Sequence, residues 1–489
     1  MTRFLTVMAL VLCICGLAVA AEPDLTTSDP FAQFWNNVMK YPFQDWGNED
    51  TTWGQMMESV ELGGYLRVRY ETTEIRSVQR IFGPSPTGPG QTAAVNRLAM
   101  VGERWADWVA YKALFTMKLD LTTDIMFYGS LINMNVVGEN ARFRRTMPAN
   151  AGTGGARVKS PQIHDPEVTV YEGYMQWNNF VFPGITAKVG RQELVYGNQW
   201  LLSNNSFYGG LSYDAAKLSI NATEEYSVDF FAGQVNSVYA LPGPSRPEIC
   251  GMYLTYIAAP GIEEGQDTLL DVYVLYNTDH MNAADLGTRA DFAKERRYTL
   301  GSRLAGHLLP DIDYSLQGAY QIGRTAESVG TTSHADIEAY AAEVEIGKTW
   351  TDINWTPRIG LRAGYASGDS NAADGDAEAF NPLYQNPHGM HGLADVFHFT
   401  NLVDYAATLT MRPDENWTIG AEGHIFRLAE RIPGGSKELG REIDLFAKLQ
   451  ATDTFSVALV WASFDQGKAF RNGTGPHSQR VYLNFEYSF

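Results

Sequence analysis

The chain has 489 residues and a formal net charge of -19, and 45% of its residues are hydrophobic. The excess of acidic side chains argues against a nucleic-acid partner, because such partners select basic surfaces. No long uncharged apolar run follows the amino terminus, which excludes a transmembrane helix there; the length fits two or three soluble domains or one very large β-barrel.

The amino terminus has the pattern of a secretory signal peptide. Arg3 precedes an apolar run over residues 4–17, and small residues at 18–21 offer a cleavage site. The run is too short to span a bilayer. We therefore predict a signal peptide at residues 1–21, which leaves Cys250 as the one cysteine of the mature protein and excludes an intrachain disulfide.

Residues 22–61 are predicted to form a separate periplasmic or lumenal segment. Phe31, Phe34, Trp35 and Met39 recur at helical spacing within it. Three alternatives stay open from the sequence: a short periplasmic helix, a plug in a barrel lumen, or a disordered leader.

From residue 62 onward, apolar and polar residues alternate in long segments, as in β-strands with one apolar face. Each segment has about ten to fifteen residues, enough for a tilted strand to cross a membrane. We expect eighteen strands, near residues 62–74, 109–121, 124–137, 168–178, 184–192, 210–222, 225–236, 250–259, 267–277, 297–308, 311–323, 336–349, 354–366, 396–411, 416–428, 440–451, 454–465 and 479–489.

The connections between these strands alternate in length. Links after even-numbered strands are short, such as 122–123 and 452–453, whereas links after odd-numbered strands are long, such as 138–167 and 367–395. This alternation is typical of a transmembrane barrel. We predict a single antiparallel up-and-down β-barrel over residues 62–489, with short periplasmic turns and long extracellular loops.

The parity of side chains within the strands predicts a charged lumen. Leu66, Val68 and Tyr70 should face lipid, so Arg67 and Arg69 should face inward. Charges of both signs on the inward face require a water-filled lumen, which indicates a channel. The alternative for each single residue is a charge pair that stiffens the barrel wall. The same parity places inward Glu71, Lys112, Lys118, Asp120, Glu172, Lys188, Asp229, Asp271, Arg303, His307, Glu343, Arg358, Arg362, Glu422, His424, Asp444, Lys448 and Glu486.

The carboxy-terminal residues 481–489 alternate without a break and end on an aromatic residue. Their apolar face includes Tyr487 and Phe489. The pattern resembles the terminal signal of bacterial outer-membrane barrels, in which the last strand closes the barrel. That resemblance implies that the barrel-assembly machinery reads Tyr487 and Phe489.

Several short segments resemble the alginate-export family of outer-membrane proteins. They are residues 66–71, 189–194 with Gly197, 364–369, 380–384 with His388 and Gly392, 401–402, and 440–445. The resemblance extends from about residue 62 to the end of the chain and implies an eighteen-stranded, porin-like barrel.

The resemblance also implies an arginine-rich constriction, in which guanidinium groups pair with the carboxylates of a uronate polymer. It assigns this role to Arg191 in the Gly-Arg-Gln segment. Face parity adds further candidates for the pathway: Arg67, Arg69, Arg303, Arg358 and Arg362. Because acids are as numerous as bases on the inward faces, both an anionic polysaccharide and small hydrophilic solutes remain candidate cargoes.

Two loop clusters are candidate metal sites. An acidic stretch offers carboxylates and carbonyls for Ca²⁺, or is a solvated external loop; its members are Asp369, Asn371, Asp374 and Asp376. Three histidines close in sequence are either metal ligands or hydrogen-bonding loop residues: His388, His391 and His398. No other cofactor is expected.

No nucleophile motif, nucleotide-binding loop or zinc spacing occurs, so we do not expect an enzyme. The function that we expect is an outer-membrane channel. Its expected partners are outer-membrane lipid and lipopolysaccharide, the barrel-assembly machinery, and a polysaccharide or small solute. The alternatives are an outer-membrane barrel enzyme and a plugged, surface-binding barrel without channel activity.

Overall fold

The computed structural model describes twelve stretches of the chain. They are residues 60–75, 104–138, 168–221, 223–237, 248–260, 266–279, 295–326, 333–371, 374–386, 388–431, 435–470 and 477–489. The predicted signal peptide, the helical pattern within residues 31–39 and most of the loop at 138–167 lie outside the described residues.

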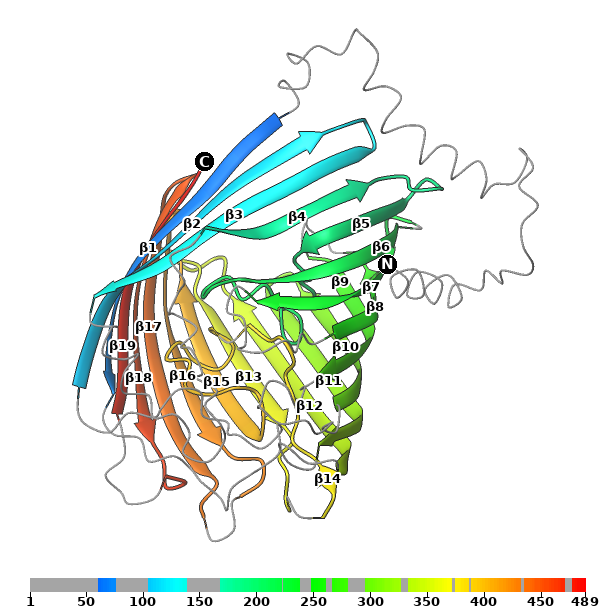
Figure 1. The fold of residues 1–489 in the computed structure, drawn as a ribbon. Helices are drawn as coiled ribbons and strands as arrows, with labels where there is room; N and C mark the ends of the chain where they lie inside the picture. The colour runs from blue at the N-terminus through cyan, green and yellow to red at the C-terminus, as the bar shows by residue number, and fades with distance from the viewer. Residues whose placement is uncertain are drawn as a thin grey trace, which may run out of the picture.

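Antiparallel β-strands form a closed barrel (Figure 1). The barrel strands are β1 (Val60–Ile75), β2 (Arg104–Asp120), β3 (Ile125–Gly138), β4 (Thr169–Trp177), β5 (Ile185–Gln192), β6 (Leu211–Asn221), β7 (Tyr226–Ser237), β8 (Glu248–Ala259), β9 (Thr268–Asp279), β10 (Glu295–Leu309), β11 (Ile312–Ala326), β12 (His334–Thr349), β13 (Arg358–Ala366), β15 (Leu402–Met411), β16 (Trp417–Arg427), β17 (Glu438–Thr452), β18 (Phe455–Gln466) and β19 (His477–Ser488). The short strand β14 (Asp376–Ala377) runs parallel to β12 inside a loop. Consecutive barrel strands pair, and β1 pairs with both β2 and β19. The predicted all-β barrel of eighteen strands is confirmed.

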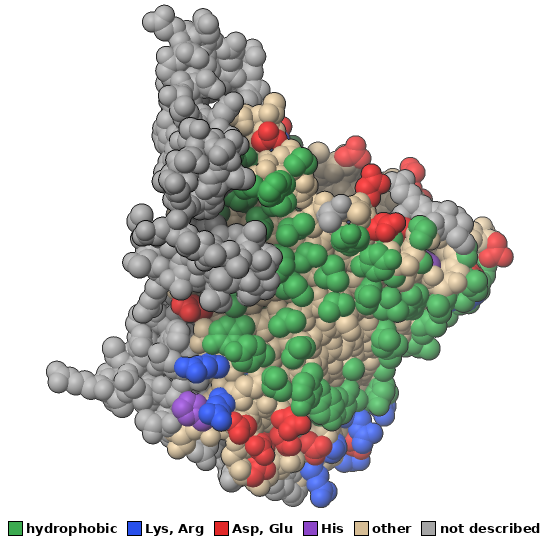
Figure 2. Space-filling view, turned by 90° about the vertical axis from the view of Figure 1, so that its right-hand side faces the viewer, with side chains coloured by type: hydrophobic (Ala, Val, Ile, Leu, Met, Phe, Trp, Pro, Cys, Tyr) green, Lys and Arg blue, Asp and Glu red, His purple; other side chains and the backbone are tan. Residues whose placement is uncertain are grey.

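The outer face of the barrel is apolar. Along β12, buried and exposed residues alternate, and the exposed set includes Tyr340 at 51% and Val344 at 46%. Figure 2 shows such side chains as a broad hydrophobic belt, with acidic and basic side chains gathered at its lower edge. A belt of this kind is the surface that an outer-membrane barrel presents to lipid. Among the described residues, no helix has the length and apolar character to cross a membrane.

The terminal strand closes the barrel as expected. Residues of β19 pair in antiparallel register with β1, and the backbones of Gly64 and Phe489 exchange two hydrogen bonds of 3.0 and 3.1 Å. Tyr487 and Phe489 are exposed and stack on each other at 6.0 Å between ring centroids. A Cβ on Gly64 would lie 2.3 Å from the Phe489 ring, so a side chain there would have to displace that ring.

The largest error in a predicted strand start precedes β15. The strand expected from residue 396 begins only at Leu402, because the preceding residues belong to a loop inside the barrel. Phe397 and Phe399 are 2% and 0% exposed, and they pack on Phe426 and Trp200 at 4.8 and 5.4 Å between ring centroids. Their apolar character reflects burial in the lumen rather than contact with lipid.

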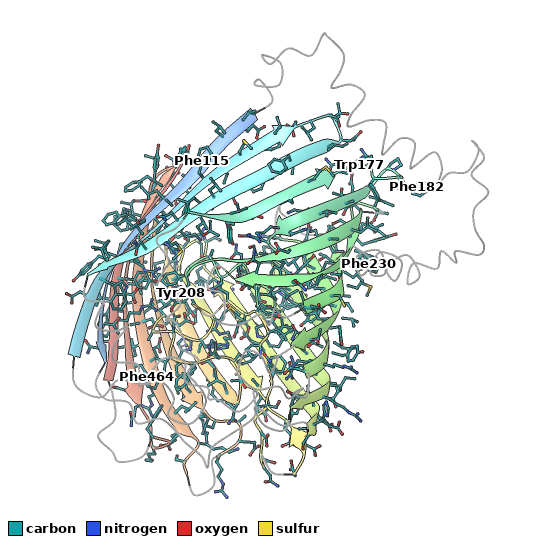
Figure 3. The ribbon with its side chains drawn as sticks, viewed as in Figure 1. Phe115, Trp177, Phe182, Tyr208, Phe230 and Phe464 are labelled. Atoms are coloured by element: carbon teal, nitrogen blue, oxygen red, sulfur yellow. The ribbon has the colours of Figure 1, made fainter. Side chains whose placement is uncertain are left out.

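Two loops fold into the lumen and join each other there. The β5–β6 loop covers residues 193–210, and the β13–β15 loop covers residues 367–401. The Tyr384 N–H donates to the Leu201 carbonyl at 2.9 Å, and the Ser203 hydroxyl donates to the Tyr384 carbonyl at 2.7 Å. Small inward side chains such as Ala339 and Ala341 on β12 leave room for the aromatic residues of these loops. Figure 3 shows Tyr208 of the β5–β6 loop inside the barrel and Phe115 on its outer face.

Candidate functional site

Four basic side chains gather on the lumen face near the closing seam. Arg67 and Arg69 come from β1, Lys112 from β2 and Arg480 from β19, and all four are 5% exposed or less. The antiparallel register sets Arg67 directly opposite Lys112, so charges from neighbouring strands meet on one face. We call these four residues the basic wall.

The tip of the β5–β6 loop rests on the basic wall. Arg67 donates to the carbonyls of Ser206 and Phe207 at 3.2 and 2.5 Å. Arg69 donates to the Phe207 carbonyl at 3.1 Å, and Lys112 donates to that of Ser206 at 3.1 Å. The Arg69 guanidinium also lies 4.0 Å from the centre of the Phe207 ring. Carbonyls and ring faces satisfy these donors without cancelling their charge.

Two buried carboxylates complete the charged group. Glu71 lies 3.2 Å from Arg69 Nε and 2.8 Å from Arg480 Nε. Asp395 of the β13–β15 loop lies 2.5 Å from Arg480 Nη1. These two carboxylates pair with Arg69 and Arg480, and one of them belongs to a loop rather than to the barrel. Glu486 of β19 lies opposite Arg67 in the register.

His388 connects both loops to the terminal strand. Its ring stacks on Phe207 at 3.4 Å between centroids, its Nδ1 lies 2.9 Å from Asp395, and its Nε2 lies 3.1 Å from the Tyr482 hydroxyl. The Tyr208 hydroxyl also donates to Asp395. Burial lowers the pKa of His388, against the attraction of Asp395. Burial alone would raise the pKa of Asp395, but His388 and Arg480 hold it below its ordinary value.

Comparison with known proteins identifies the family of the chain. The family model described as alginate export matches residues 62–484, which is most of the chain. The chain belongs to the alginate export family. No curated protein matches the chain.

Solved structures share the barrel of this alginate export family member at low sequence identity. OpdL of Pseudomonas aeruginosa is 9% identical with a TM-score of 0.56, over 88% of this chain and 99% of its own. OccAB2 of Acinetobacter baumannii is 11% identical with a TM-score of 0.54, over 88% and 98%. OpdK of P. aeruginosa, solved with vanillate, is 9% identical with a TM-score of 0.52, over 88% and 99%. At these identities the likeness establishes the fold alone.

Three of the predicted pathway arginines lie on the lumen face in ion pairs. Arg303, Arg358 and Arg362 have side chains that are 19%, 25% and 14% exposed. Their carboxylate partners are Asp271 at 3.1 Å, Asp313 at 2.6 Å and Glu422 at 3.2 Å. Arg69 pairs with a wall carboxylate in the same way, through Glu71, whereas Arg67 donates to the carbonyls of the β5–β6 loop. The ion pairs of Arg303, Arg358 and Arg362 join different strands, so they fit the alternative in which a charge pair stiffens the barrel wall.

Arg191 lies on the opposite face of its strand. It shares the face of Val189, which is 42% exposed, whereas the adjacent Gln192 is fully buried on the lumen side. Its guanidinium forms a two-point contact with Asp214 of β6, at 2.7 and 3.2 Å. The resemblance matched the local segment but carried no information on which face the strand turns inward, so we do not retain Arg191 in the pathway.

The predicted loop metal residues make local turns. Asp369 Oδ1 accepts the Asn371 N–H at 2.9 Å, and Asp374 Oδ1 accepts the Asp376 N–H at 3.1 Å. A calcium site at this stretch stays a prediction. The nearby histidines do not converge, because His388 binds Asp395 whereas His391 binds Asp404 at 3.0 Å.

Sequence reasoning left Arg480 and Phe207 out of the pathway. Arg480 has the inward parity of Tyr482 and lies within the predicted strand 479–489, so the parity argument applied to the whole strand would have found it. Phe207 offers no such signal, because its partners Arg69 and His388 are distant in the sequence.

Proposed function

We propose that this member of the alginate export family is an outer-membrane channel for carboxylate-bearing solutes or uronate polymers. The basic wall carries the proposal, because three of its four buried cations, Arg67, Arg69 and Lys112, donate to neutral carbonyls at the tip of the β5–β6 loop. A carboxylate entering the lumen can replace those carbonyls with charge-assisted hydrogen bonds, which are shorter and stronger. We infer a carboxylate cargo from this pairing of basic side chains with carboxylates.

The loops favour a small solute over a polymer as long as they stay in place. The β5–β6 and β13–β15 loops are hydrogen-bonded to each other across the lumen and anchored to the basic wall. A polymer requires the two loops to separate, whereas a small carboxylate needs only a path along the wall. OpdK, whose barrel is similar, was solved with vanillate, which carries one carboxylate.

A plugged barrel without channel activity is the second candidate, and the same interlocked loops favour it. In both cases we propose the bacterial outer membrane as location, with lipid and lipopolysaccharide around the apolar belt. We also propose that the assembly machinery reads the exposed terminal pair Tyr487 and Phe489.

Single-channel recording of the folded barrel in planar bilayers tests the proposal. A salt gradient gives the ion selectivity, and galacturonate or its oligomers are compared with neutral sugars of the same size as blockers. We expect anion preference and block by the uronates. The double variant Arg67→Gln/Arg69→Gln should shift the reversal potential toward cation preference, because it removes two charges of the basic wall.

The matched control is Arg324→Gln. The Arg324 side chain is 69% exposed and pairs with Asp336 at 3.0 Å. The control should keep the parent reversal potential. A folded barrel without conductance would support the plugged candidate, and an unchanged selectivity in the double variant would remove the basic wall from the pathway.

A further inference from the structure

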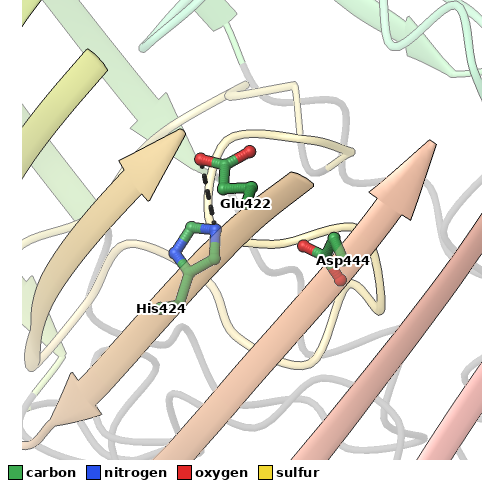
Figure 4. A group of neighbouring side chains, drawn as sticks. All are labelled: Glu422, His424 and Asp444. Carbon is green, nitrogen blue, oxygen red and sulfur yellow. Dashed lines mark ion pairs between the residues drawn. The ribbon is translucent and has the colours of Figure 1, made fainter. Parts of the chain in front are cut away.

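A second cluster of titratable side chains lies on the wall of β16 and β17, apart from the basic wall. Glu422 and His424 come from β16 and Asp444 from β17, and one ligand atom of each lies within 4.8 Å of the others (Figure 4). The register sets Glu422 directly opposite Asp444, and His424 directly opposite Glu442. Three of these four residues are at most 2% exposed: His424, Glu442 and Asp444.

Buried polar atoms of this cluster lack hydrogen-bond partners among the described residues. They are His424 Nε2, Asp444 Oδ1 and Glu442 Oε2. The second oxygen of each carboxylate is used: Asp444 Oδ2 accepts the Leu393 N–H at 3.1 Å, and Glu442 Oε1 accepts the Ala394 N–H at 2.8 Å. Unpaired carboxylate oxygens in a buried place are costly, so a proton or a cation is needed between them.

The histidine is oriented as a metal ligand is. His424 Nδ1 lies 2.9 Å from Asp404 Oδ1, and Asp404 Oδ2 lies 3.0 Å from His391 Nδ1. A carboxylate that accepts from Nδ1 leaves the Nε2 lone pair free for a metal, and such outer carboxylates fix the ring in many zinc sites. His424 Nε2 lies 3.3 Å from Glu422 Oε1, on the side of the other two ligand atoms.

The charge of the cluster also calls for a cation. Four carboxylates meet here, those of Asp404, Glu422, Glu442 and Asp444, whereas the fixed cation in ion-pair contact with them is Arg362, at 3.2 Å from Glu422 and 3.8 Å from Asp404. His424 lies between Asp404 and Glu422, at 2.9 and 3.3 Å, so a metal on Nε2 would take the place of a proton there. A bound dication would offset the remaining repulsion between the carboxylates.

We propose that His424 Nε2, Glu422 and Asp444 bind a divalent transition-metal ion of the Zn²⁺ class, with Glu442 or water in the fourth position. One imidazole nitrogen with carboxylate oxygens suits zinc, whereas calcium and magnesium favour oxygen ligands alone. The site is new relative to the proposed channel function and does not depend on it.

The metal would also fix the β13–β15 loop to the barrel wall. The loop reaches this cluster through the N–H groups of Leu393 and Ala394, and a Cβ on Gly392 would lie 2.2 Å from Glu442 Oε1. Glu442 and Asp444 can therefore hold the loop by one oxygen and the ion by the other.

The test is metal binding to the full folded barrel in detergent micelles, measured by equilibrium dialysis against Zn²⁺ after chelator treatment. Co²⁺ is the spectroscopic probe, because its visible d–d absorption reports low-coordinate nitrogen and oxygen ligation. We expect one ion per chain. Asp444→Asn and His424→Gln should abolish this stoichiometric binding, and Asp404→Asn should weaken it about 10- to 100-fold, as expected for an outer ligand.

His334→Gln is the control, because His334 is exposed at the start of β12. It should bind Zn²⁺ as the parent does. Heat-modifiable migration on gels verifies that each variant is folded, and Glu422→Gln serves as a further variant if one of the others fails this check. A folded parent without Zn²⁺ or Co²⁺ binding overturns the proposal, as does binding that survives both His424→Gln and Asp444→Asn.

Discussion

Replacement of Arg480 by glutamine should release the β13–β15 loop from the barrel. Arg480 is 3% exposed and joins Glu71 of β1 to Asp395 of the loop, at 2.8 and 2.5 Å, and it also donates to the Leu393 carbonyl at 3.1 Å. Its loss leaves Asp395 buried without its arginine, whereas Glu71 keeps Arg69 at 3.2 Å. Removal of one partner from a buried ion pair costs about 3–5 kcal/mol.

This cost destabilises the closed state of the loop relative to the open state. In the open state Asp395 is hydrated, while the barrel strands stay paired. At about 1.4 kcal/mol per factor of ten, the opening equilibrium should rise roughly 100- to 4,000-fold. Hydrogen exchange of the folded barrel measures it, as faster exchange of the amides in residues 388–401.

Arg324→Gln is again the matched control. Its ion pair with Asp336 has side chains that are 69% and 68% exposed, and such pairs contribute about 0–1 kcal/mol. Exchange of residues 388–401 in this variant should equal that of the parent. If Arg480→Gln shows the same exchange as Arg324→Gln, the buried ion pairs do not anchor the loop and the reasoning fails.

Two further predictions concern pH and the closing seam. Because His388 has a lowered pKa in the closed loop, the open state takes up the proton as pH falls below about 6.5, so anchoring should weaken there. Asp395 has a lowered pKa as well, so its contribution is present above about pH 4 and is lost below it; hydrogen exchange at stepped pH should therefore rise toward acid, and a flat profile would contradict both assignments. Gly64→Val should lower the yield of folded barrel, because its Cβ would lie 2.3 Å from the Phe489 ring, whereas Gly318→Ala meets its nearest atom at 3.5 Å and should fold normally; equal yields on gels would refute the steric argument.

The sequence by itself determined the barrel. Strand alternation and loop length are local properties, so they predicted all eighteen strands and the inward faces of residues such as Arg67 and Arg303. The same locality explains the error at residues 396–401, where buried loop aromatics such as Phe399 have the same composition as a lipid-facing strand.

Only the tertiary structure decided what fills the barrel and where its charges meet. Arg480 and Glu71 are 409 residues apart, and Phe207 reaches His388 from a different loop, so no local pattern joins them. The face of Arg191 likewise depends on its register with β6. The docking of the loops depends on contacts between distant segments, whereas the two faces of a strand follow from the alternation of its consecutive residues.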